Sequence, residues 1–388
     1  MAVINPLLVD TGTPPIPEAQ AWLRAYDGAA GPPIDLSQAV PGYPPPPSLL
    51  AALAEAAGRP AAASYGPIVG DAALRDAYAA DVSRLYGGAI GAGEIAITAG
   101  CNQAFFVAMI ALARAGEAVL LPSPWYFNHE MTLHMLGIEA RPLPCSPQAG
   151  FVPDAAQAEG LIDGRVRAIV LVTPNNPTGA VYPPDTIRAF SDLCRRRGIW
   201  LVLDETYRDF MGERGQRPHA VFAQEGWRDH LVGLYSFSKS YCVPGHRLGA
   251  ITAGREPLAE IGKILDCMQI CPARPGQIAL APAIAALAEW REGNRQEIAA
   301  RAAAFRAALA GTPWRIDSIG AYFAYVAHPF AGRGATEVAG ALARTCGVLG
   351  LPGSYFGPGQ DGHLRIAFAN AGQDAIGQLP QRLAGFSL

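Results

Sequence analysis

The segment 231–249, Leu-Val-Gly-Leu-Tyr-Ser-Phe-Ser-Lys-Ser-Tyr-Cys-Val-Pro-Gly-His-Arg-Leu-Gly, joins a short apolar stretch to a turn rich in serine and glycine. Its first six residues, 231–236, predict a buried strand because most of them are apolar and turn residues follow them. Serines at 236, 238 and 240 surround Lys239, and Arg247 follows eight residues later. The segment therefore predicts a lysine at the end of a buried strand.

Lysine is rare in this chain, since Lys239 and Lys263 are its only lysines among 30 basic residues. Arginine stays protonated in proteins, whereas a lysine removed from water can lose its proton and form a Schiff base. A surface lysine in a turn is the alternative interpretation of Lys239. The other polar residues of the chain must therefore show whether the amine has a chemical partner.

Composition restricts the class of protein. The chain has 388 residues, of which 50% are hydrophobic and 16% charged, as expected for a large buried core. A net charge of −3 offers no basic surface for nucleic acid. The first residues lack the basic start of a signal peptide, and apolar runs such as 104–113 are too short to span a bilayer. We expect a cytoplasmic protein with no nucleic-acid or membrane partner.

The seven cysteines are scattered along the chain. Their odd number and wide spacing predict neither a disulfide framework nor a zinc site. Cys267 and Cys271 share a helix face, but no second pair of ligands lies near them in sequence. We expect reduced thiols and no metal.

Short apolar stretches alternate with helical stretches from residue 94 onward. The predicted strands are 95–98, 118–121, 138–142, 167–172, 199–204, 231–236 and 248–253, and the helices between them include 101–115, 126–137 and 185–197. Most of these strands follow a helix or a long crossover, which favours an α/β fold with a mostly parallel seven-stranded sheet between helices.

The rest of the chain predicts a smaller α+β domain built from both termini. After residue 315 we expect a strand at 321–326, a helix at 335–346 and a strand at 363–368. The proline-rich residues 1–47 are expected to pack with this domain and cover a cleft. The predicted units are therefore the segment 1–47, a large domain at 48–285 and a small domain at 286–388.

Polar residues follow four of the predicted strands. Gly100 opens a helix after strand 95–98, Asn176 follows strand 167–172, Asp204 ends strand 199–204, and Lys239 follows strand 231–236. Ligands of parallel sheets collect at the carboxyl ends of the strands, and a helix start is suited to a phosphate. Single candidates also have a structural explanation. Asn176 can lie in a plain turn, Tyr65 of the loop 64–71 can serve packing, and Arg365 of strand 363–368 can form a surface ion pair.

An amine, a phosphate site and a strand-end carboxylate together suit one kind of cofactor. An aldehyde that carries a ring nitrogen and a phosphate would bind the amine covalently. The carboxylate would keep the ring nitrogen protonated, so that the ring accepts electrons. Asp204 and Lys239 are the matching pair.

At this point the sequence resembles the class I/II aminotransferases, which are fold-type I pyridoxal-phosphate enzymes, over essentially its whole length. The motifs that carry the resemblance are Tyr65…Gly70…Leu74-Arg75, Asn176-Pro177-Thr178-Gly179, Asp204-Glu205-Thr206-Tyr207, Ser236-Phe237-Ser238-Lys239, Pro244-Gly245-His246-Arg247-Leu248-Gly249 and Leu364-Arg365.

The resemblance implies pyridoxal 5'-phosphate as the cofactor and a role for each matched residue. Lys239 would form the internal aldimine and then move a proton, with Asp204 and Tyr207 as the other catalytic residues. The implied cofactor-binding residues are Tyr65, Gly100, Cys101, Asn102, Tyr126, Asn176, Asp204, Tyr207, Ser236, Ser238, Lys239 and Arg247. The implied substrate-binding residues are Ala39, Val40, Asn176 and Arg365. Tyr65 would reach the phosphate of the neighbouring subunit, which implies a homodimer.

The sequence departs from the family pattern at positions that concern the substrate. Ala39 replaces a usual glycine, and Ile278 aligns with the arginine that aspartate-specific members use for a second carboxylate. An acidic substrate is therefore not expected, although Arg274 lies close to this position. Trp125 is the alternative to Tyr126 as the ring that stacks on the cofactor. Further candidates for the substrate pocket are Ile16 and Tyr43.

The resulting hypothesis is a ping-pong aminotransferase that moves an amino group from an L-amino acid to a 2-oxo acid. The same residues can also serve a lyase or an oxidase that acts on an amino acid. A ligand-sensing regulatory domain is the alternative from outside enzymology, but no basic helix-turn-helix pattern precedes residue 48.

Overall fold

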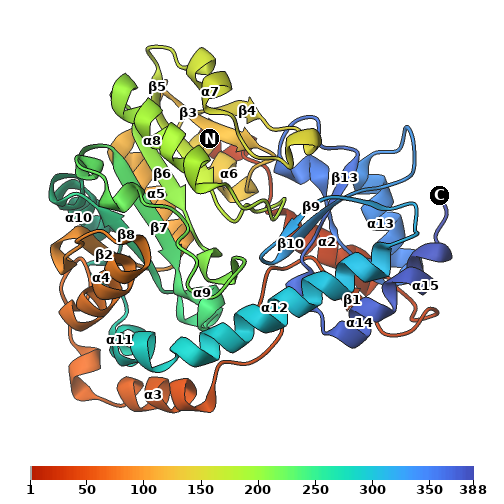
Figure 1. Ribbon diagram of the computed structural model, residues 1–388, viewed down its shortest axis with the longest axis horizontal. Coiled ribbons are helices and arrows are strands. Elements are labelled where there is room, and N and C mark those ends of the chain that lie inside the picture. The colour runs from red at the N-terminus through yellow and green to blue at the C-terminus, as the bar shows by residue number, and fades with distance from the viewer. Residues whose placement is uncertain (1) are drawn as a thin grey trace.

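The computed structural model describes residues 2–388 and contains two main sheets (Figure 1). The larger sheet has a hydrophobic core on each face, and the smaller sheet packs on a core of its own. A seven-stranded sheet occupies the larger part of the molecule, and a four-stranded sheet occupies the smaller part. No helix among the described residues is long and apolar enough to cross a membrane. All seven cysteines have free thiols.

The large sheet has the order β2-β8-β7-β6-β5-β3-β4. Its strands are β2 (Ile95–Thr98), β3 (Ala118–Ser123), β4 (Glu139–Pro144), β5 (Val166–Val172), β6 (Trp200–Asp204), β7 (Leu231–Ser236) and β8 (Gly249–Ala253). Only β8 runs against its neighbours in this sheet, while the other pairs are parallel. The predicted α/β fold with a mostly parallel seven-stranded sheet is confirmed.

Alternate residues of the central strands enter cores on opposite faces of the sheet. In β5, Ile169 and Leu171 belong to one core, whereas Ala168 and Val170 belong to the other. Helices that cover the first face are α3 (Pro47–Ala57), α4 (Ala72–Tyr86), α7 (Ala155–Leu161), α8 (Pro184–Arg197) and α11 (Arg274–Ala286). Helices that cover the second face are α5 (Cys101–Leu112), α6 (Phe127–Met135) and α10 (Arg255–Gln269). Burial on both faces explains the uninterrupted apolar strands.

The smaller sheet is antiparallel and has the order β12-β13-β10-β9. Its strands are β9 (Arg315–Gly320), β10 (Phe323–Ala327), β12 (Leu351–Pro352) and β13 (His363–Ile366). The remaining helices of this part are α13 (Ala335–Cys346), α14 (Gln373–Gly377) and α15 (Leu379–Ala384), and the amino-terminal helices are α1 (Pro6–Asp10) and α2 (Pro15–Arg24). Strand β1 (Ile34–Asp35) pairs with β11 (Val348–Leu349), so the amino-terminal segment and the carboxyl-terminal part share a short two-stranded sheet. The boundaries at residues 47 and 285 stay predictions.

Helix α12 (Ala288–Leu309) links the two parts and crosses below both in Figure 1. Its later residues Ile298 and Phe305 belong to the core of the smaller part. Its first turns lie near α11 and the 3₁₀ turn at Arg208–Phe210. Helix α12 therefore packs against elements of both the larger and the smaller part of the molecule.

The loop that carries Asn176 packs directly on the turn between β9 and β10. Gly179 in this loop has φ +75°, and a Cβ there would overlap backbone atoms of Gly320 and Phe323. Glycine is required here both for the left-handed conformation and for the close approach of two backbones.

We predict that Gly179→Ala lowers the free energy of unfolding by about 2–5 kcal/mol, because left-handed strain and overpacking add together. Gly150→Ala is the matched control, since Gly150 has φ +60° but open space around its Cα. The control should lose only about 1–2 kcal/mol. Denaturant unfolding of both variants measures the difference, and equal losses would contradict the close contact.

Candidate active site

A cavity of about 300 Å³ opens at the carboxyl ends of β5, β6 and β7. Predicted site residues that line it are Val40, Cys101, Asn102, Tyr126, Asn176, Asp204, Tyr207, Ser236, Ser238, Lys239 and Arg247. Gln38, Val172, Thr206 and Pro244 line it as well, although no sequence motif indicated a role for them. The strand ends thus bring together residues that are more than 100 positions apart in sequence.

Lys239 lies in the single turn α9 (Phe237–Ser240) that follows β7. Its Nζ donates a hydrogen bond to the carbonyl oxygen of Ala39, which itself is not part of the cavity wall. Burial lowers the pKa of the Lys239 amine to about 8, and the positive charges of Arg247 and Arg365 act in the same direction. The amine is therefore far more often unprotonated near neutral pH than an ordinary lysine.

Asp204, at the end of β6, is buried and faces His129 of α6. The distance from His129 Nε2 to Asp204 Oδ2 is 3.3 Å, and the Thr206 amide donates to Asp204 Oδ1 at 3.0 Å. Burial raises the pKa of Asp204, but the hydrogen bonds from His129 and Thr206 outweigh it, so the pKa is lowered. The carboxylate is therefore kept charged inside the protein.

His129 is a site residue that no sequence motif indicated. Its ring stacks on Phe105, with 3.9 Å between the centroids, which fixes its orientation toward Asp204. The available signal was its spacing of three residues from Tyr126, because residues three apart share a helix face. That spacing alone did not indicate a carboxylate partner.

Hydrogen-bond donors gather at the start of α5. Gly100 precedes this helix with φ +83°, and a Cβ there would collide with the guanidinium of Arg247. The hydroxyl of Ser238 is buried and has no partner among the described residues, while Ser236 Oγ accepts from the Ser238 amide at 3.3 Å. A helix start, an arginine and a free serine hydroxyl together suit a phosphate group.

Arg365 of β13 lies behind the cavity wall rather than in it. Its guanidinium donates to Asn176 Oδ1 at 3.3 Å and to the Ser37 carbonyl oxygen, and its Nε has no partner among residues 2–388. The rings of Phe323 and Phe356 flank it at 5.1 and 5.2 Å. Burial lowers the pKa of Arg365 to about 10, so it remains charged at neutral pH.

Tyr65 does not join the site within one chain, because 77% of its surface is exposed and it lines no part of the cavity. Its predicted contact with a neighbouring subunit stays a prediction. Tyr126 lines the cavity and Trp125 does not. Arg274 is held by Asp71 at 3.1 Å and by the Ala61 carbonyl oxygen.

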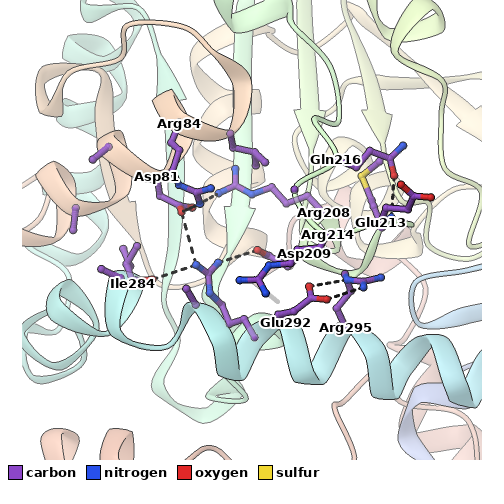
Figure 2. A pocket seen from close by; sticks show the side chains of 18 residues that line it. Asp81, Arg84, Arg208, Asp209, Glu213, Arg214, Gln216, Ile284, Glu292 and Arg295 are labelled. Carbon is purple, nitrogen blue, oxygen red and sulfur yellow. Dashed lines mark hydrogen bonds and ion pairs between the residues drawn. The ribbon is translucent and has the colours of Figure 1, made fainter.

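A larger cavity of about 510 Å³ lies elsewhere, between α4, the loop after β6 and the first turns of α12 (Figure 2). Many of its charged groups pair with one another, as Glu292 does with Arg295 at 2.8 Å and Arg291 with Asp209 at 3.0 Å. Lys239 and Asp204 do not line it. The smaller cavity, which Lys239 and Asp204 line, is therefore the better candidate for the active site despite its size.

Comparison with known proteins identifies the family. The family described as "Aminotransferase class I and II" matches residues 32–383. This chain belongs to that family and is a pyridoxal-phosphate-dependent transaminase.

Curated relatives of this chain include two aminotransferases that are at least 30% identical over more than two thirds of both chains. The aromatic aminotransferase ISS1 of Arabidopsis thaliana is 30% identical over 90% of this chain and 88% of its own length. A valine–pyruvate aminotransferase of Mycobacterium tuberculosis is 33% identical over 69% of this chain and 68% of its own length. Among solved structures, Thermus thermophilus aspartate aminotransferase with maleate has a TM-score of 0.90, 23% identity and 99% coverage of each chain. That last likeness concerns the fold alone.

The family implies pyridoxal phosphate, and the residues of the cavity fit it. The unpartnered Ser238 hydroxyl beside Arg247 offers a donor for the phosphate. The lowered pKa of Lys239 suits attack on an aldehyde, and the charged Asp204 suits a protonated ring nitrogen.

We predict that the Lys239 amine reacts with an acylating reagent in a pH-dependent manner with a midpoint near pH 8. The rate should rise as pH increases through this value, because only the unprotonated amine is a nucleophile. Competitive labelling of the cofactor-free protein followed by peptide mapping measures this, with the exposed Lys263 as the internal reference for the reagent. A midpoint near the ordinary value of about 10.4 would contradict the buried amine.

Proposed function

We propose that this chain transfers the amino group of an L-amino acid to a 2-oxo acid in two half-reactions at Lys239. The observation that carries this proposal is the arrangement around one cavity of a buried amine, a charged carboxylate and donors suited to a phosphate. Each of these groups is needed for amino-group transfer, and family membership supports their common use.

Pyridoxal phosphate, when bound, supplies the aldehyde and the electron-accepting ring. Lys239 would hold it through Nζ, and Ser236, Ser238, Arg247 and the amides of residues 100–102 would hold its phosphate. Asp204 would keep the ring nitrogen protonated, with His129 as the support for its charge. Burial raises the pKa of Tyr207, so its hydroxyl stays protonated and can donate to the ring oxygen together with Asn176.

Once a substrate has bound, Lys239 would move a proton to and from the substrate Cα. A lysine amine with a pKa near 8 exchanges protons readily near neutral pH. The enclosing Tyr126 and Val40 would limit the access of water to this proton. Proton transfer by Lys239 is therefore the chemical step assigned to this chain's own residues.

Arg365 would bind the substrate α-carboxylate as a bidentate pair. Its position beside Asn176 and its unpartnered Nε support this role. The carboxylate would replace the carbonyl oxygen of Ser37 as the acceptor. Val40 and the backbone of Ala39 would then lie against the substrate.

The substrate side chain is proposed to be uncharged. Val40, Tyr126 and Val172 contribute apolar or aromatic surface to the cavity, and Gln38 contributes a neutral amide. Arg274 already pairs with Asp71 and is not free for a second carboxylate within this chain. The named substrates of the aromatic and valine–pyruvate relatives are of this uncharged kind.

The proposal includes a homodimer in the cytoplasm, in which Tyr65 of one subunit reaches the phosphate site of the other. The large exposed fraction of the Tyr65 side chain, 77%, supports a partner at this position. The domain boundaries 48–285 and 286–388 are part of the same proposal.

The central prediction concerns Lys239→Ala. This variant should lose the visible absorbance band of the covalently bound cofactor and should not form alanine from pyruvate with any L-amino acid. Lys263→Ala is the control and should keep both, because Lys263 lies on the exposed side of α10. Retention of the band in Lys239→Ala would reject the proposal.

A donor screen at fixed pyruvate, repeated with 2-oxoglutarate, gives the reaction type and the side-chain class. Alanine or glutamate formation supports transamination, with uncharged donors expected to be preferred. Release of ammonia without the new amino acid would instead indicate a lyase or an oxidase.

We predict that Arg365→Lys raises the KM for amino acids about tenfold or more, because lysine cannot form the bidentate pair. Arg382→Lys is the matched control, since Arg382 is also buried but contacts Cys346 and Pro32 in the smaller part. The control should lower the thermal stability and leave the KM within about twofold of the unmodified enzyme. Steady-state kinetics of both variants checks this, and an unchanged KM in Arg365→Lys would move the carboxylate site elsewhere.

A further inference from the structure

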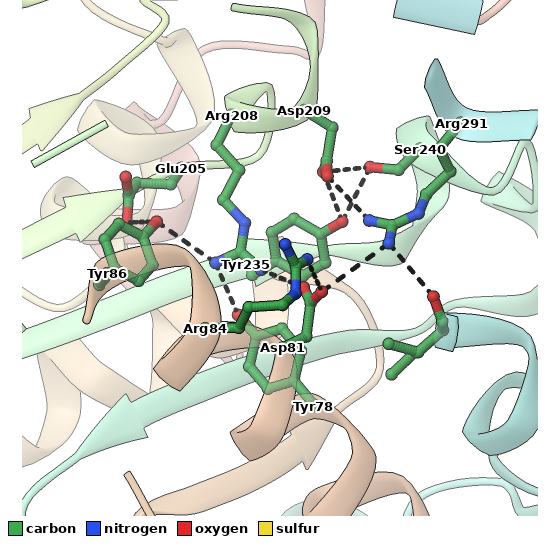
Figure 3. A network of polar contacts seen from close by, with 11 residues as sticks. Tyr78, Asp81, Arg84, Tyr86, Glu205, Arg208, Asp209, Tyr235, Ser240 and Arg291 are labelled. Atoms are coloured by element: carbon green, nitrogen blue, oxygen red, sulfur yellow. Dashed lines mark hydrogen bonds and ion pairs between the residues drawn. The ribbon is translucent and has the colours of Figure 1, made fainter. Parts of the chain in front are cut away.

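A buried polar network includes Ser240, the residue after Lys239, and its members Asp209, Ser240 and Tyr235 do not line the cavity (Figure 3). At its centre, Asp209 Oδ2 accepts hydrogen bonds from Ser240 Oγ at 2.5 Å and Tyr235 Oη at 2.7 Å. The two hydroxyls are themselves 2.8 Å apart. Asp209 therefore binds the residue directly after Lys239.

The carboxylate of Asp209 is held from its other side by Arg291. The distance from an Arg291 terminal nitrogen to Asp209 Oδ1 is 3.0 Å. Burial raises the pKa of Asp209, but the charges of Arg291 and Arg208 and the two hydroxyl hydrogen bonds lower it by a larger amount. The net pKa is lowered, so the group is a carboxylate. Arg291 is fixed in turn by the Ile284 carbonyl oxygen at 3.2 Å and by the face of Tyr241.

A second branch of the same network reaches the residue after Asp204. Arg208 lies over the ring of Tyr235 at 4.0 Å and donates to the hydroxyl of Tyr86 at 3.3 Å. Tyr86 donates to Glu205 at 2.6 Å, and Glu205 directly follows Asp204. The residues next to Lys239 and next to Asp204 are thus tied to one buried cluster.

We propose that Asp209 is a positioning residue that acts through Ser240 and keeps the Lys239 amine inside the cavity. This inference rests on the proposed function of Lys239 as the residue that holds the cofactor. Asp209 touches neither the amine nor the cavity, since it lines the separate cavity beside α12. Its effect on the amine passes through the backbone of the α9 turn.

The physical reason is the flexibility of the lysine side chain. The long lysine side chain has a large rotamer entropy, so the amine tends to move toward water unless its backbone is fixed. Within the cavity, burial together with Arg247 and Arg365 favours the unprotonated amine. A turn released from Asp209 would let the amine reach water and regain its proton, which reduces its ability to capture an aldehyde.

Two matched variants separate positioning from simple stabilisation. Ser240→Ala and Tyr235→Phe each remove one hydroxyl from Asp209 Oδ2 and leave the other in place. Both residues are buried, but only Ser240 adjoins Lys239. Thermal unfolding of the two variants reports any general loss of stability.

The measurement is the rate at which the full-length, cofactor-free protein captures pyridoxal phosphate, followed by absorbance from pH 6 to pH 10. We predict that the midpoint for Ser240→Ala rises by about one pH unit, so that capture at pH 7 slows about tenfold. Tyr235→Phe should stay within about twofold of the unmodified protein at every pH. Asp209→Asn should give the same shift as Ser240→Ala, and Ser240→Thr, which keeps a hydroxyl, should restore the original midpoint.

An unchanged midpoint in either Ser240→Ala or Asp209→Asn would overturn the positioning role, and so would an equal shift in Ser240→Ala and Tyr235→Phe. Lys239→Ala, measured in parallel, distinguishes this failure from failure of the proposed function. If Lys239→Ala still captures the cofactor, Lys239 is not the attachment point. If it does not, and Ser240→Ala behaves as the unmodified protein, only the role of Asp209 is rejected.

Discussion

The removal of a lysine amine from water, beside two guanidinium groups, is the constraint on which the site depends. Burial, Arg247 and Arg365 all disfavour the charged form of Lys239 and bring its pKa to about 8. The same arginines are suited to a phosphate and a carboxylate, so under the proposed function one set of charges would both lower the pKa of the amine and bind the anionic groups of its partners. Asp204 supplies the opposite charge, kept ionised by His129 and Thr206.

The sheet topology makes this concentration of charge possible. Parallel β5, β6 and β7 end at one edge, where Asn176, Asp204 and Lys239 follow them. A second set of charged groups, around Asp209 and Arg208, is buried beside the turn of Lys239 and is linked by ion pairs and hydrogen bonds. Helix α12 contributes Arg291 to that support and Ile298 to the core of the smaller part. The helix that joins the two parts of the molecule thus also supplies an ion pair to the network that binds Ser240, the residue after Lys239.

Much of the fold was predictable because buried strands leave a strong local signal. The seven strands of the large sheet were found with bounds that differ by at most two residues, and the helix at 335–346 was found as α13. The prediction of a strand at 321–326 was wrong at its start, because Ala321 has φ +44° in the turn before β10. Strand β9 was missed since its residues are partly exposed and mostly polar. The predicted residues Asn176, Asp204 and Lys239, which follow strand ends, line the cavity, whereas the contacts of His129 and Asp209 are encoded by no local pattern.

The scarcity of lysine has a consequence for chemical selectivity. An aldehyde that approaches this chain meets 28 arginines that cannot condense with it under mild conditions, and one exposed lysine side chain. That lysine, Lys263, already has both oxygens of Glu260 within 2.7 Å of its ammonium. Off-target adducts on side chains are therefore disfavoured by composition, and the covalent chemistry proposed for Lys239 would meet little competition from other lysines.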